Sequence, residues 1–260
     1  MSNRLKDKRC VIVGATTGIG LAAARRFLEE GARLVVAGLD RGQVQQLSGD
    51  CYFHPCDVTA AAQVESLFTK AIERLGGLDV LYHVAGASGR RYGDGSLHEC
   101  SDEGWQATID ANLKTLFLTN RAAVRLFLKQ GSGGTILNMS SVLALSPSPR
   151  YFDTVAYTAS KGGIIALSRQ AAARYAGDKI RVNVLAPAVI DTPMAGRAVS
   201  DPAIHAFLQS KQPFGPGPGS AEDCADAAVF LCSEEARFIT GVVLPIDGGW
   251  MVRDGQWVDA

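Results

Sequence analysis

Short apolar runs alternate with longer amphipathic stretches along the whole chain. Many of the short runs are continuous in Val, Ile and Leu instead of alternating between apolar and polar residues. This pattern is typical of strands in a parallel sheet that helices cover on both faces. The expected strands are Cys10–Val13, Leu34–Ala37, Tyr52–His54, Val80–Val84, Thr135–Met139, Ile180–Leu185 and Val242–Ile246.

The stretches between these strands predict helices. They are Ile19–Glu30, Ala60–Leu75, Asp102–Lys129, Tyr157–Tyr175 and Glu222–Cys232. In the third of them, apolar residues recur at helical spacing and predict one buried stripe, formed by Trp105, Ile109, Leu113 and Leu116. The alternation of strand and helix over the whole length predicts a doubly wound α/β fold.

Length and composition favour a single domain. The chain has 260 residues, of which 47% are hydrophobic and 20% charged, which suits one domain over 1–260 with a sizeable core. The stretch from Thr192 to Pro213 has no strand pattern, and the Gly-Pro run 215–219 behind it cannot form regular structure. We expect a substrate lid over roughly 191–219, with a passive surface loop as the alternative.

Charge and cysteine content exclude several classes of protein. Lys and Arg total 26, as do Asp and Glu, and no basic run suggests a nucleic-acid partner. The six cysteines are scattered, which predicts free thiols in a reducing compartment. The first apolar stretch ends at Gly14 and is too short for a signal sequence or a membrane span. We therefore expect a cytoplasmic protein that makes no membrane contact.

The first expected strand runs into a glycine-rich turn, Gly14-Ala15-Thr16-Thr17-Gly18-Ile19-Gly20, and then into a helix. Glycines let the backbone bend sharply and let a pyrophosphate come close, while the helix N-terminus offers free N–H groups to the anion. The spacing is Gly-x-x-x-Gly-x-Gly instead of the commoner Gly-x-Gly-x-x-Gly. A tight turn without a ligand is the alternative, but the position after the first strand favours phosphate binding.

A tyrosine and a lysine open another expected helix. Tyr157 and Lys161 are four residues apart and therefore lie on one helical face. Upstream, Ser140 and Ser141 follow the strand Thr135–Met139, at the edge where a doubly wound sheet binds its ligands. Taken alone, the pair is equally compatible with a surface aromatic beside a solvated lysine.

With further motifs added, the chain resembles the short-chain dehydrogenase/reductase family. The motifs follow in order over nearly the whole chain: Gly14, Gly18 and Gly20, Asp57-Val58, Ala85-Gly86, Asn112, Ser141, Tyr157 and Lys161, Asn183 to Pro187, Thr192, Thr240-Gly241 and Asp247-Gly248-Gly249. The resemblance implies a single Rossmann-type, three-layer domain with a seven-stranded parallel sheet. It also implies an NAD(P)-dependent oxidoreductase that moves a hydride between the nicotinamide cofactor and an alcohol or carbonyl substrate, acting on CH–OH groups.

The resemblance further implies a catalytic tetrad of Asn112, Ser141, Tyr157 and Lys161 that needs no metal. Tyr157 would be the general acid/base, and a lysine cation about 5 Å away would lower its pKa by about two at an effective dielectric near 20. Ser141, preferred to Ser140 as the second serine of the pair, would bind the substrate oxygen. Asn112 would shape its helix and anchor a water that leads to Lys161.

The resemblance also assigns cofactor contacts. They are Gly14, Thr16, Thr17, Gly18, Ile19, Gly20, Asp40, Asp57, Val58, Ala85, Gly86, Tyr157, Lys161, Pro187, Ile190 and Thr192. At the end of the second strand, an acid binds the ribose 2′-hydroxyl of NAD, whereas a basic residue binds the 2′-phosphate of NADP. Asp40 and the lack of an obvious phosphate partner favour NAD, while Arg41, if turned inward, leaves NADP open.

The chain departs from the family pattern at four places. Val13, His83-Val84, Ala188 and Pro216 stand where relatives generally have threonine, Asn-Asn, glycine and arginine. The methyl of Ala188 adds bulk near the nicotinamide site. With Pro216 in place of the arginine, the contact between that loop and its neighbours is in doubt.

Two loops are longer than usual and should rim the site. They carry Arg90, Arg91 and Arg150, which are candidates for recognising an anionic or polyhydroxylated substrate. Solvated loop charges are the alternative.

Two alternative functions stay open. One is an NADP-dependent ketone or 3-oxoacyl reductase, and the other is a catalytically silent nucleotide-binding regulator, which the filled tetrad disfavours. The resemblance implies a homotetramer or homodimer in which Asp102–Lys129 and Tyr157–Tyr175 pair across one interface. The tail from Trp250 to Ala260 would contribute to another.

Overall fold

Seven parallel strands form the central sheet. The computed structural model describes residues 3–215 and 217–254, and its strands are β1 (Arg9–Val13), β2 (Arg33–Gly38), β3 (Cys51–Pro55), β4 (Val80–His83), β5 (Gly134–Met139), β6 (Ile180–Pro187) and β7 (Val243–Ile246). They lie in the order β3-β2-β1-β4-β5-β6-β7, and all neighbours are parallel. The expected doubly wound fold with a seven-stranded sheet is confirmed. Its strand order reverses between β1 and β4, where such sheets form a ligand crevice.

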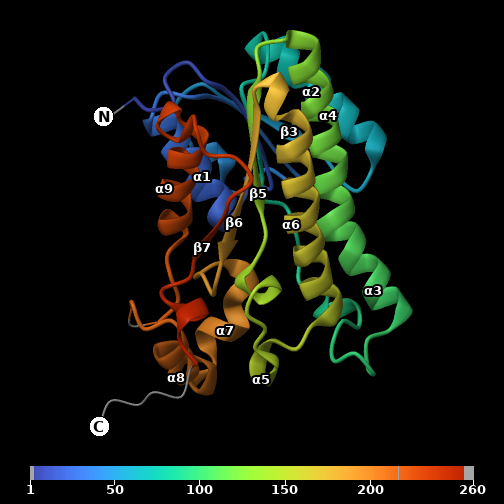
Figure 1. The fold of residues 1–260 in the computed structure, drawn as a ribbon, viewed down its shortest axis with the longest axis vertical. Coiled ribbons are helices and arrows are strands. Elements are labelled where there is room, and N and C mark those ends of the chain that lie inside the picture. Colours follow the sequence, from blue (N-terminus) through green and yellow to red (C-terminus); the bar gives the residue numbers. More distant parts are fainter. Residues whose placement is uncertain (1–2, 216, 255–260) are drawn as a thin grey trace.

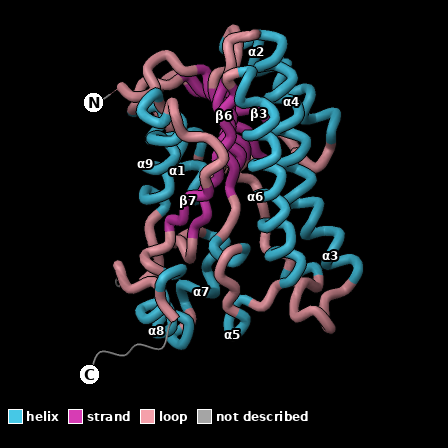
Figure 2. The backbone as a smooth tube through the Cα atoms, viewed as in Figure 1, coloured by secondary structure: helices cyan, strands magenta, loops and turns pink. Residues whose placement is uncertain are grey.

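Helices cover both faces of this sheet (Figure 2). On one face α1 (Gly18–Glu29) and α9 (Ala221–Cys232) pack against each other. On the other face lie α2 (Ala61–Leu75), α4 (Thr115–Gln130) and α6 (Val155–Tyr175), as Figure 1 shows. Within the described residues, no helix combines the length and the apolar character needed to cross a membrane.

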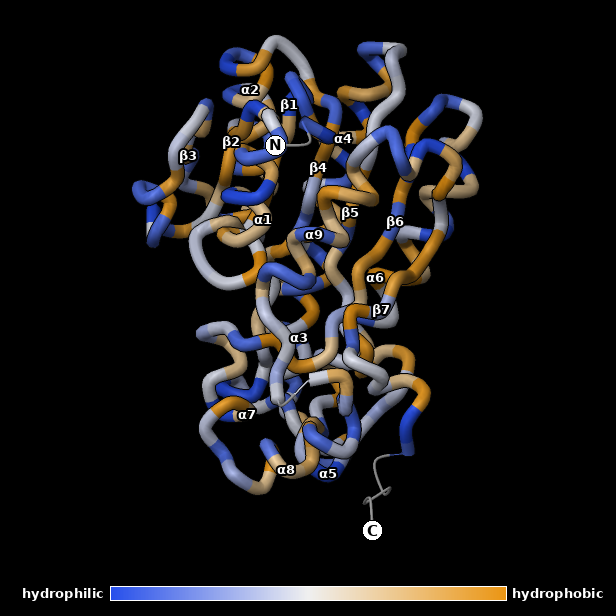
Figure 3. Tube along the Cα trace, turned by 90° about the vertical axis from the view of Figure 1, so that its left-hand side faces the viewer, coloured by the Kyte–Doolittle hydropathy of each residue, from blue (hydrophilic) through white to orange (hydrophobic). Residues whose placement is uncertain are grey.

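The two helical layers explain why many strand positions are apolar on both faces of the sheet. In β1, Val11 and Val13 join the core on the side of α2 and α4, whereas Cys10 and Ile12 join the core on the side of α1 and α9. Successive strand side chains point to opposite faces, so both must be apolar when both are covered. In Figure 3 β6 lies to the right of β4 and β5, and much of the chain around it has the hydrophobic colour.

The long helix expected over 102–129 is divided into three parts. They are α3 (Asp102–Ile109), a π-helical turn (Asp110–Lys114) and α4. The expected buried stripe is wrong over most of its length, because Trp105 is 43% exposed and Ile109 and Leu113 are only half-buried. The row of residues beside this stripe faces inward instead. Gly104 belongs to that row, and it packs so closely that an added Cβ would lie 2.4 Å from the carbonyl carbon of Gly93.

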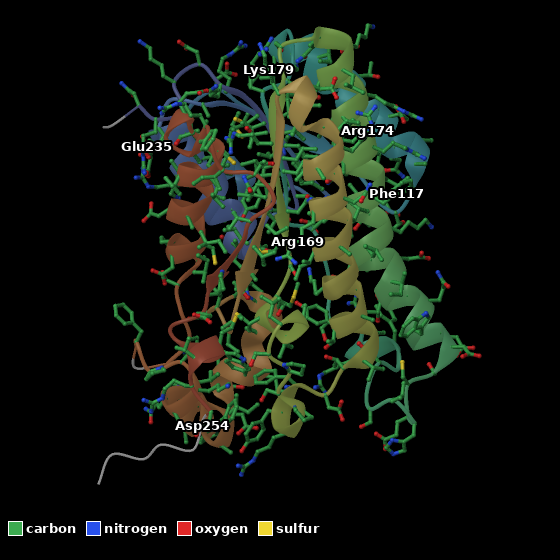
Figure 4. All side chains as sticks on the ribbon, viewed as in Figure 1. Phe117, Arg169, Arg174, Lys179, Glu235 and Asp254 are labelled. Carbon is green, nitrogen blue, oxygen red and sulfur yellow. The ribbon has the colours of Figure 1, made fainter. Side chains whose placement is uncertain are left out.

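Three short helices gather at one end of the molecule. They are α5 (Pro149–Phe152), α7 (Gly196–Ser200) and α8 (Pro202–Lys211), at the lower end in Figure 1. Figure 4 labels Lys179, which directly precedes β6, at the opposite end, so the carboxyl end of β6 points toward these helices. The segment that the sequence marks as a lid or loop is thus partly helical. Pro216, one of the noted departures, and the tail beyond 254 lie outside the described residues.

Candidate active site

A cavity of about 1070 Å³ lies at the carboxyl ends of the strands. Its walls contain every residue that the sequence suggests for the tetrad and for the cofactor. They meet there because six parallel strands each end at this site and are followed by at least one of them: Gly14 after β1, Asp40 after β2, Asp57 after β3, Ala85 after β4, Ser141 after β5 and Ile190 after β6. Residues that are far apart in the sequence are therefore brought to one site.

The glycine-rich turn is fixed by close backbone packing. Gly14 has φ +83°, and a Cβ there would lie 2.6 Å from the amide nitrogen of Ala85. A Cβ on Gly20 would lie 2.0 Å from the carbonyl oxygen of Gly14. Both positions therefore exclude any side chain, and the turn holds the start of α1 at the cavity wall.

The N-terminus of α1 has no side-chain cap. Thr17, at the cap position, makes no capping hydrogen bond, and the first turn contains no acidic residue. Side-chain oxygens of Ser101, Asp201 and Ser220 cap α3, α8 and α9, whereas the cap residues of α2, α4 and α6 make no such bond, as in α1. Among the described residues, no side-chain oxygen accepts a hydrogen bond from the first amides of α1, and the cavity wall there includes Thr17 and Gly18. This arrangement fits the pyrophosphate of a dinucleotide.

Tyr157 stands near the start of α6 and forms a hydrogen bond with the side chain of Ser141. Ser141 follows β5, and its Oγ also accepts a bond of 3.2 Å from the amide of Leu143. Burial raises the pKa of Tyr157 to about 12, while the Ser141 bond acts in the lowering direction. In the protein without cofactor, burial therefore outweighs the lowering of the Tyr157 pKa that was expected from Lys161.

Lys161 is almost fully buried, at 3% exposure, beside Tyr157. Its Nζ donates a bond of 3.1 Å to the carbonyl of Met139 and lies 5.4 Å from the centre of the Tyr157 ring. Burial lowers the pKa of Lys161 to about 8. Ser140 instead donates a bond of 2.8 Å to the Lys161 carbonyl, so of the serine pair only Ser141 is bonded to the tyrosine.

Asn112 lies fully buried in the π-helical turn. Its Nδ2 donates to the carbonyls of Thr108 and Ala87, both at 2.9 Å, and Oδ1 accepts from the Ala87 amide at 3.3 Å. A Cβ on Gly86 would lie 2.6 Å from Oδ1 of Asn112 and 3.3 Å from Nζ of Lys161. The Asn112 side chain therefore fixes the loop that carries Gly86 against the lysine.

Two buried side chains near the tetrad were given no role from the sequence: Asp94, which no motif marks, and His83, which was noted only as a departure from the family pattern. The carboxylate of Asp94 accepts bonds from the backbone amides of Ala156 at 3.0 Å and Tyr157 at 2.9 Å, and Asp94 is 5% exposed. His83, at the end of β4, is fully buried, and its Nδ1 lies 2.9 Å from Oγ1 of Thr119. Burial lowers the pKa of His83 to about 3, so the imidazole is neutral.

At the end of β2, the structure separates Asp40 from Arg41. A Cβ on Gly38 would lie 2.5 Å from Cγ2 of Thr16, which explains the glycine. Asp40 and Leu39 line the cavity. Arg41 is not among the lining residues, and its guanidinium lies 5.6 Å from the centre of the Phe53 ring.

The rest of the cavity wall comes from the lid segment and from the loops and turns around it. It adds six residues that the sequence left unassigned: Tyr92, Leu143, Phe152, Val189, Met194 and Arg197. It also includes Trp250, which was expected at a subunit interface but is fully buried within its own chain. Most of them are apolar, and Ala188 lies among them. No sequence periodicity marks them, because they come from short loops that only the fold brings together.

Comparison with known proteins agrees with this geometry. A family model described as enoyl-(acyl carrier protein) reductase matches residues 14–251. A 2,5-dichloro-2,5-cyclohexadiene-1,4-diol dehydrogenase of Sphingobium indicum is 35% identical, covering 97% of this chain and 99% of the relative. A 2-(S)-hydroxypropyl-CoM dehydrogenase of Xanthobacter autotrophicus is also 35% identical, with coverage of 96% and 98%. The solved aldohexose dehydrogenase of Thermoplasma acidophilum covers both chains fully, with 31% identity and a TM-score of 0.86.

The matches cover nearly the whole length of these relatives. Their names describe dehydrogenases of hydroxyl compounds. The protein is an NAD(P)-dependent oxidoreductase that transfers a hydride between a nicotinamide cofactor and an alcohol or carbonyl group. The chain belongs to the short-chain dehydrogenase/reductase family.

Proposed function

We propose that the protein interconverts a small secondary alcohol and its ketone with NAD, and that Tyr157 is the general acid/base. The observation that carries the proposal is the meeting of Tyr157, Ser141 and the buried Lys161 in one cavity with the uncapped N-terminus of α1. The nicotinamide, when bound, supplies or accepts the hydride.

The chain's own residues handle the proton. In reduction, the Tyr157 hydroxyl gives its proton to the carbonyl oxygen as that oxygen gains negative charge, and in oxidation the tyrosinate takes the proton back. Ser141 donates a hydrogen bond to the same oxygen. Lys161, held by the Met139 carbonyl, supplies positive charge that favours the tyrosinate. Asn112 is a positioning residue through its bonds to the loop of Gly86.

NAD is the proposed cofactor. Asp40 lines the cavity at the ribose end, where a carboxylate binds a 2′-hydroxyl and repels a 2′-phosphate. Arg41, the nearest basic residue in the sequence, stacks on Phe53 instead. The remaining dinucleotide contacts proposed from the sequence all line the same cavity, which supports keeping them.

We further propose that residues 1–260 act as one domain whose segment of roughly 191–219 closes over the substrate. The base of this segment is pinned by a parallel bridge between Ile190 and Gly219. Its residues Thr192, Met194 and Arg197 line the cavity, which favours a lid over a passive loop.

A homo-oligomer, of two or four chains, is the proposed assembly. Trp105 and Phe117 are 43% and 44% exposed, and Phe117 joins Ile109, Leu113 and Leu167 in an apolar hollow between α4 and α6. We name this surface the α4–α6 face; Figure 4 labels Phe117 on it. Aromatic residues grouped on one face are typical of interfaces between subunits.

The six cysteines form no disulfide, which supports proposing the cytoplasm as the compartment.

The first test is calorimetric titration of the purified protein with NAD and with NADP, together with transfer of labelled hydride to a panel of ketones. We expect tighter binding of NAD, and hydride transfer that falls by about 10²–10⁴ in Tyr157→Phe while NAD affinity is kept. Tyr175→Phe, on the same helix but away from the cavity, is the matched control. Tighter NADP binding would overturn the cofactor proposal, and full activity of Tyr157→Phe would overturn the role of the tyrosine.

A further inference from the structure

Two arginines from distant segments converge beside the proposed catalytic groups. Arg90 lies in a short turn after β4, and Arg197 lies in α7 on the lid segment. The Nη2 atom of each donates to one acceptor, the carbonyl oxygen of Tyr151, at 3.3 Å and 2.7 Å. Since both bonds end on the same oxygen, the two nitrogens lie at most about 6 Å apart.

The positive charge of this pair is not neutralised by a direct partner. In residues 3–215 and 217–254, neither arginine forms an ion pair within 4.0 Å. The two acids that act on Arg90 are already engaged, Asp94 by the amides of α6 and Asp153 by the hydroxyl of Ser96. Burial and the charge of Arg197 together lower the pKa of Arg90.

Both guanidiniums belong to the wall of the cavity that also contains Tyr157 and Ser141. Of the other two loop arginines, Arg91 also lines the cavity and Arg150 does not. Arg150 is not among the lining residues and lies 5.2 Å from the centre of the Tyr151 ring, and Arg91 stacks on its neighbour Tyr92 at 4.6 Å. Arg90 differs from Arg91 because it shares the Tyr151 carbonyl with Arg197, which was not among the three arginines suggested by the sequence.

Solvated surface arginines are common, but they do not normally gather. Like charges repel, and a single neutral carbonyl offers only one shared acceptor for several N–H donors. The spare donors can bind an oxyanion in the paired geometry that guanidinium groups favour with carboxylate, phosphate or sulfonate. Such an anion would also join the loop of Arg90 to the lid segment of Arg197.

We propose that Arg90 and Arg197 form an anion-binding subsite, and that the substrate is a small hydroxy or oxo compound that carries an oxyanion group away from the reacting carbon. This inference rests on the proposed function and names its substrate class. The apolar wall of Phe152, Met194 and Trp250 would contact the carbon chain between the two polar ends. Binding the anion fixes the far end of the substrate and so orients its alcohol carbon toward Tyr157.

The test is a panel of short hydroxyalkanoates and oxoalkanoates of increasing length, each beside its methyl ester, together with the matching sulfonates. We expect at least one acid or sulfonate to exceed its neutral counterpart by about 100-fold in kcat/KM. In Arg90→Met and Arg197→Met, KM for that anion should rise by about 10- to 100-fold, as expected when a charge-assisted pair is lost, while kcat/KM for the ester stays within about threefold. Arg197→Lys should recover part of the loss. Arg150→Met is the matched control and should leave the preference unchanged.

A second measurement does not depend on turnover. Binding of each acid and its ester to the NAD(H)-loaded Tyr157→Phe protein is followed by calorimetry, with and without the arginine changes. Equal binding of acids and esters, or an equal loss in the Arg150 variant, would overturn the subsite. If esters exchange hydride with the cofactor and acids have no advantage, the anion subsite is refuted and the proposed reaction stands. If no compound exchanges hydride but acids bind more tightly through the two arginines, the proposed reaction fails and the subsite stands.

Discussion

The carboxylate of Asp94 accepts a hydrogen bond of 2.9 Å from the backbone amide of Tyr157, across 63 positions of sequence. Its other oxygen accepts from Ala156, so one buried acid satisfies two free amides at the N-terminus of α6. A negative charge at this end of a helix is also favoured by the helix dipole. Asp94 thus sets where α6 begins and where the proposed acid/base stands.

Asp94→Ala should lower both stability and turnover. Loss of the cap should cost about 1–2 kcal/mol of unfolding free energy, and a displaced Tyr157 should lower kcat by about 10- to 100-fold. NAD affinity should fall less than kcat, because the glycine-rich turn proposed to hold the pyrophosphate lies after β1 and away from Asp94. Melting curves, kcat and calorimetric NAD binding measure the three effects.

The matched control is Asp102→Ala, an exposed acid in the first turn of α3, which should leave kcat unchanged. A positioning role also requires that Asp94→Asn, which keeps an acceptor, recover part of kcat. If the Asn variant were as poor as the Ala variant in kcat and normal in melting temperature, positioning by these bonds would be refuted.

The pH dependence of the reaction should differ between its two directions. Burial holds the pKa of Tyr157 above its ordinary value, so the hydroxyl is protonated at neutral pH. Because oxidation needs the tyrosinate, kcat/KM for the alcohol should rise with pH. Reduction needs the protonated form, so kcat/KM for the ketone should be level near neutrality and fall at alkaline pH. Steady-state rates in both directions from pH 6 up to about pH 12 test this, because that range reaches the raised pKa of Tyr157 of about 12.

Ser141→Ala should move the alkaline rise of oxidation to higher pH. The Ser141 hydrogen bond acts to lower the pKa of Tyr157, so its removal leaves burial unopposed. Ser132→Ala, an exposed change in the turn before β5, should leave the profile in place. A rise that stays at the same pH in Ser141→Ala would show that the bond does not tune the tyrosine.

Asp40→Asn should weaken the preference for NAD. The amide keeps the shape but loses the charge that favours a ribose hydroxyl and repels a phosphate, so the ratio of the NADP and NAD dissociation constants should shift by about tenfold toward NADP. Glu235→Gln, which Figure 4 places far from the cavity end, is the charge-matched control. An unchanged ratio in calorimetry would remove Asp40 from the ribose site.

Phe117→Glu should split the assembly. Charge placed in the α4–α6 face cannot be buried without a partner, so the main species in sedimentation should become smaller. Lys129→Glu, at the end of the same helix but outside this face, should leave the assembly size unchanged. If Phe117→Glu sediments like the unchanged protein, subunits do not meet through this surface.

The features that the sequence alone determines are local or periodic. Continuous apolar runs identify the strands because a sheet with two covered faces allows no polar side. The turn at Gly14 and Gly20 is readable because its backbone contacts exclude every side chain. Tyr157 and Lys161 are readable as a pair because four residues always bring helix positions onto one face.

Tertiary packing decides the rest. Nothing local distinguishes Trp105, which is exposed, from an inward residue; its neighbour Gly104 faces inward only because Gly93 packs against it. The bond between Asp94 and Tyr157 and the meeting of Arg90 with Arg197 join segments separated by many residues. Such contacts depend on where whole helices and loops come to rest, and no spacing along the chain encodes that position.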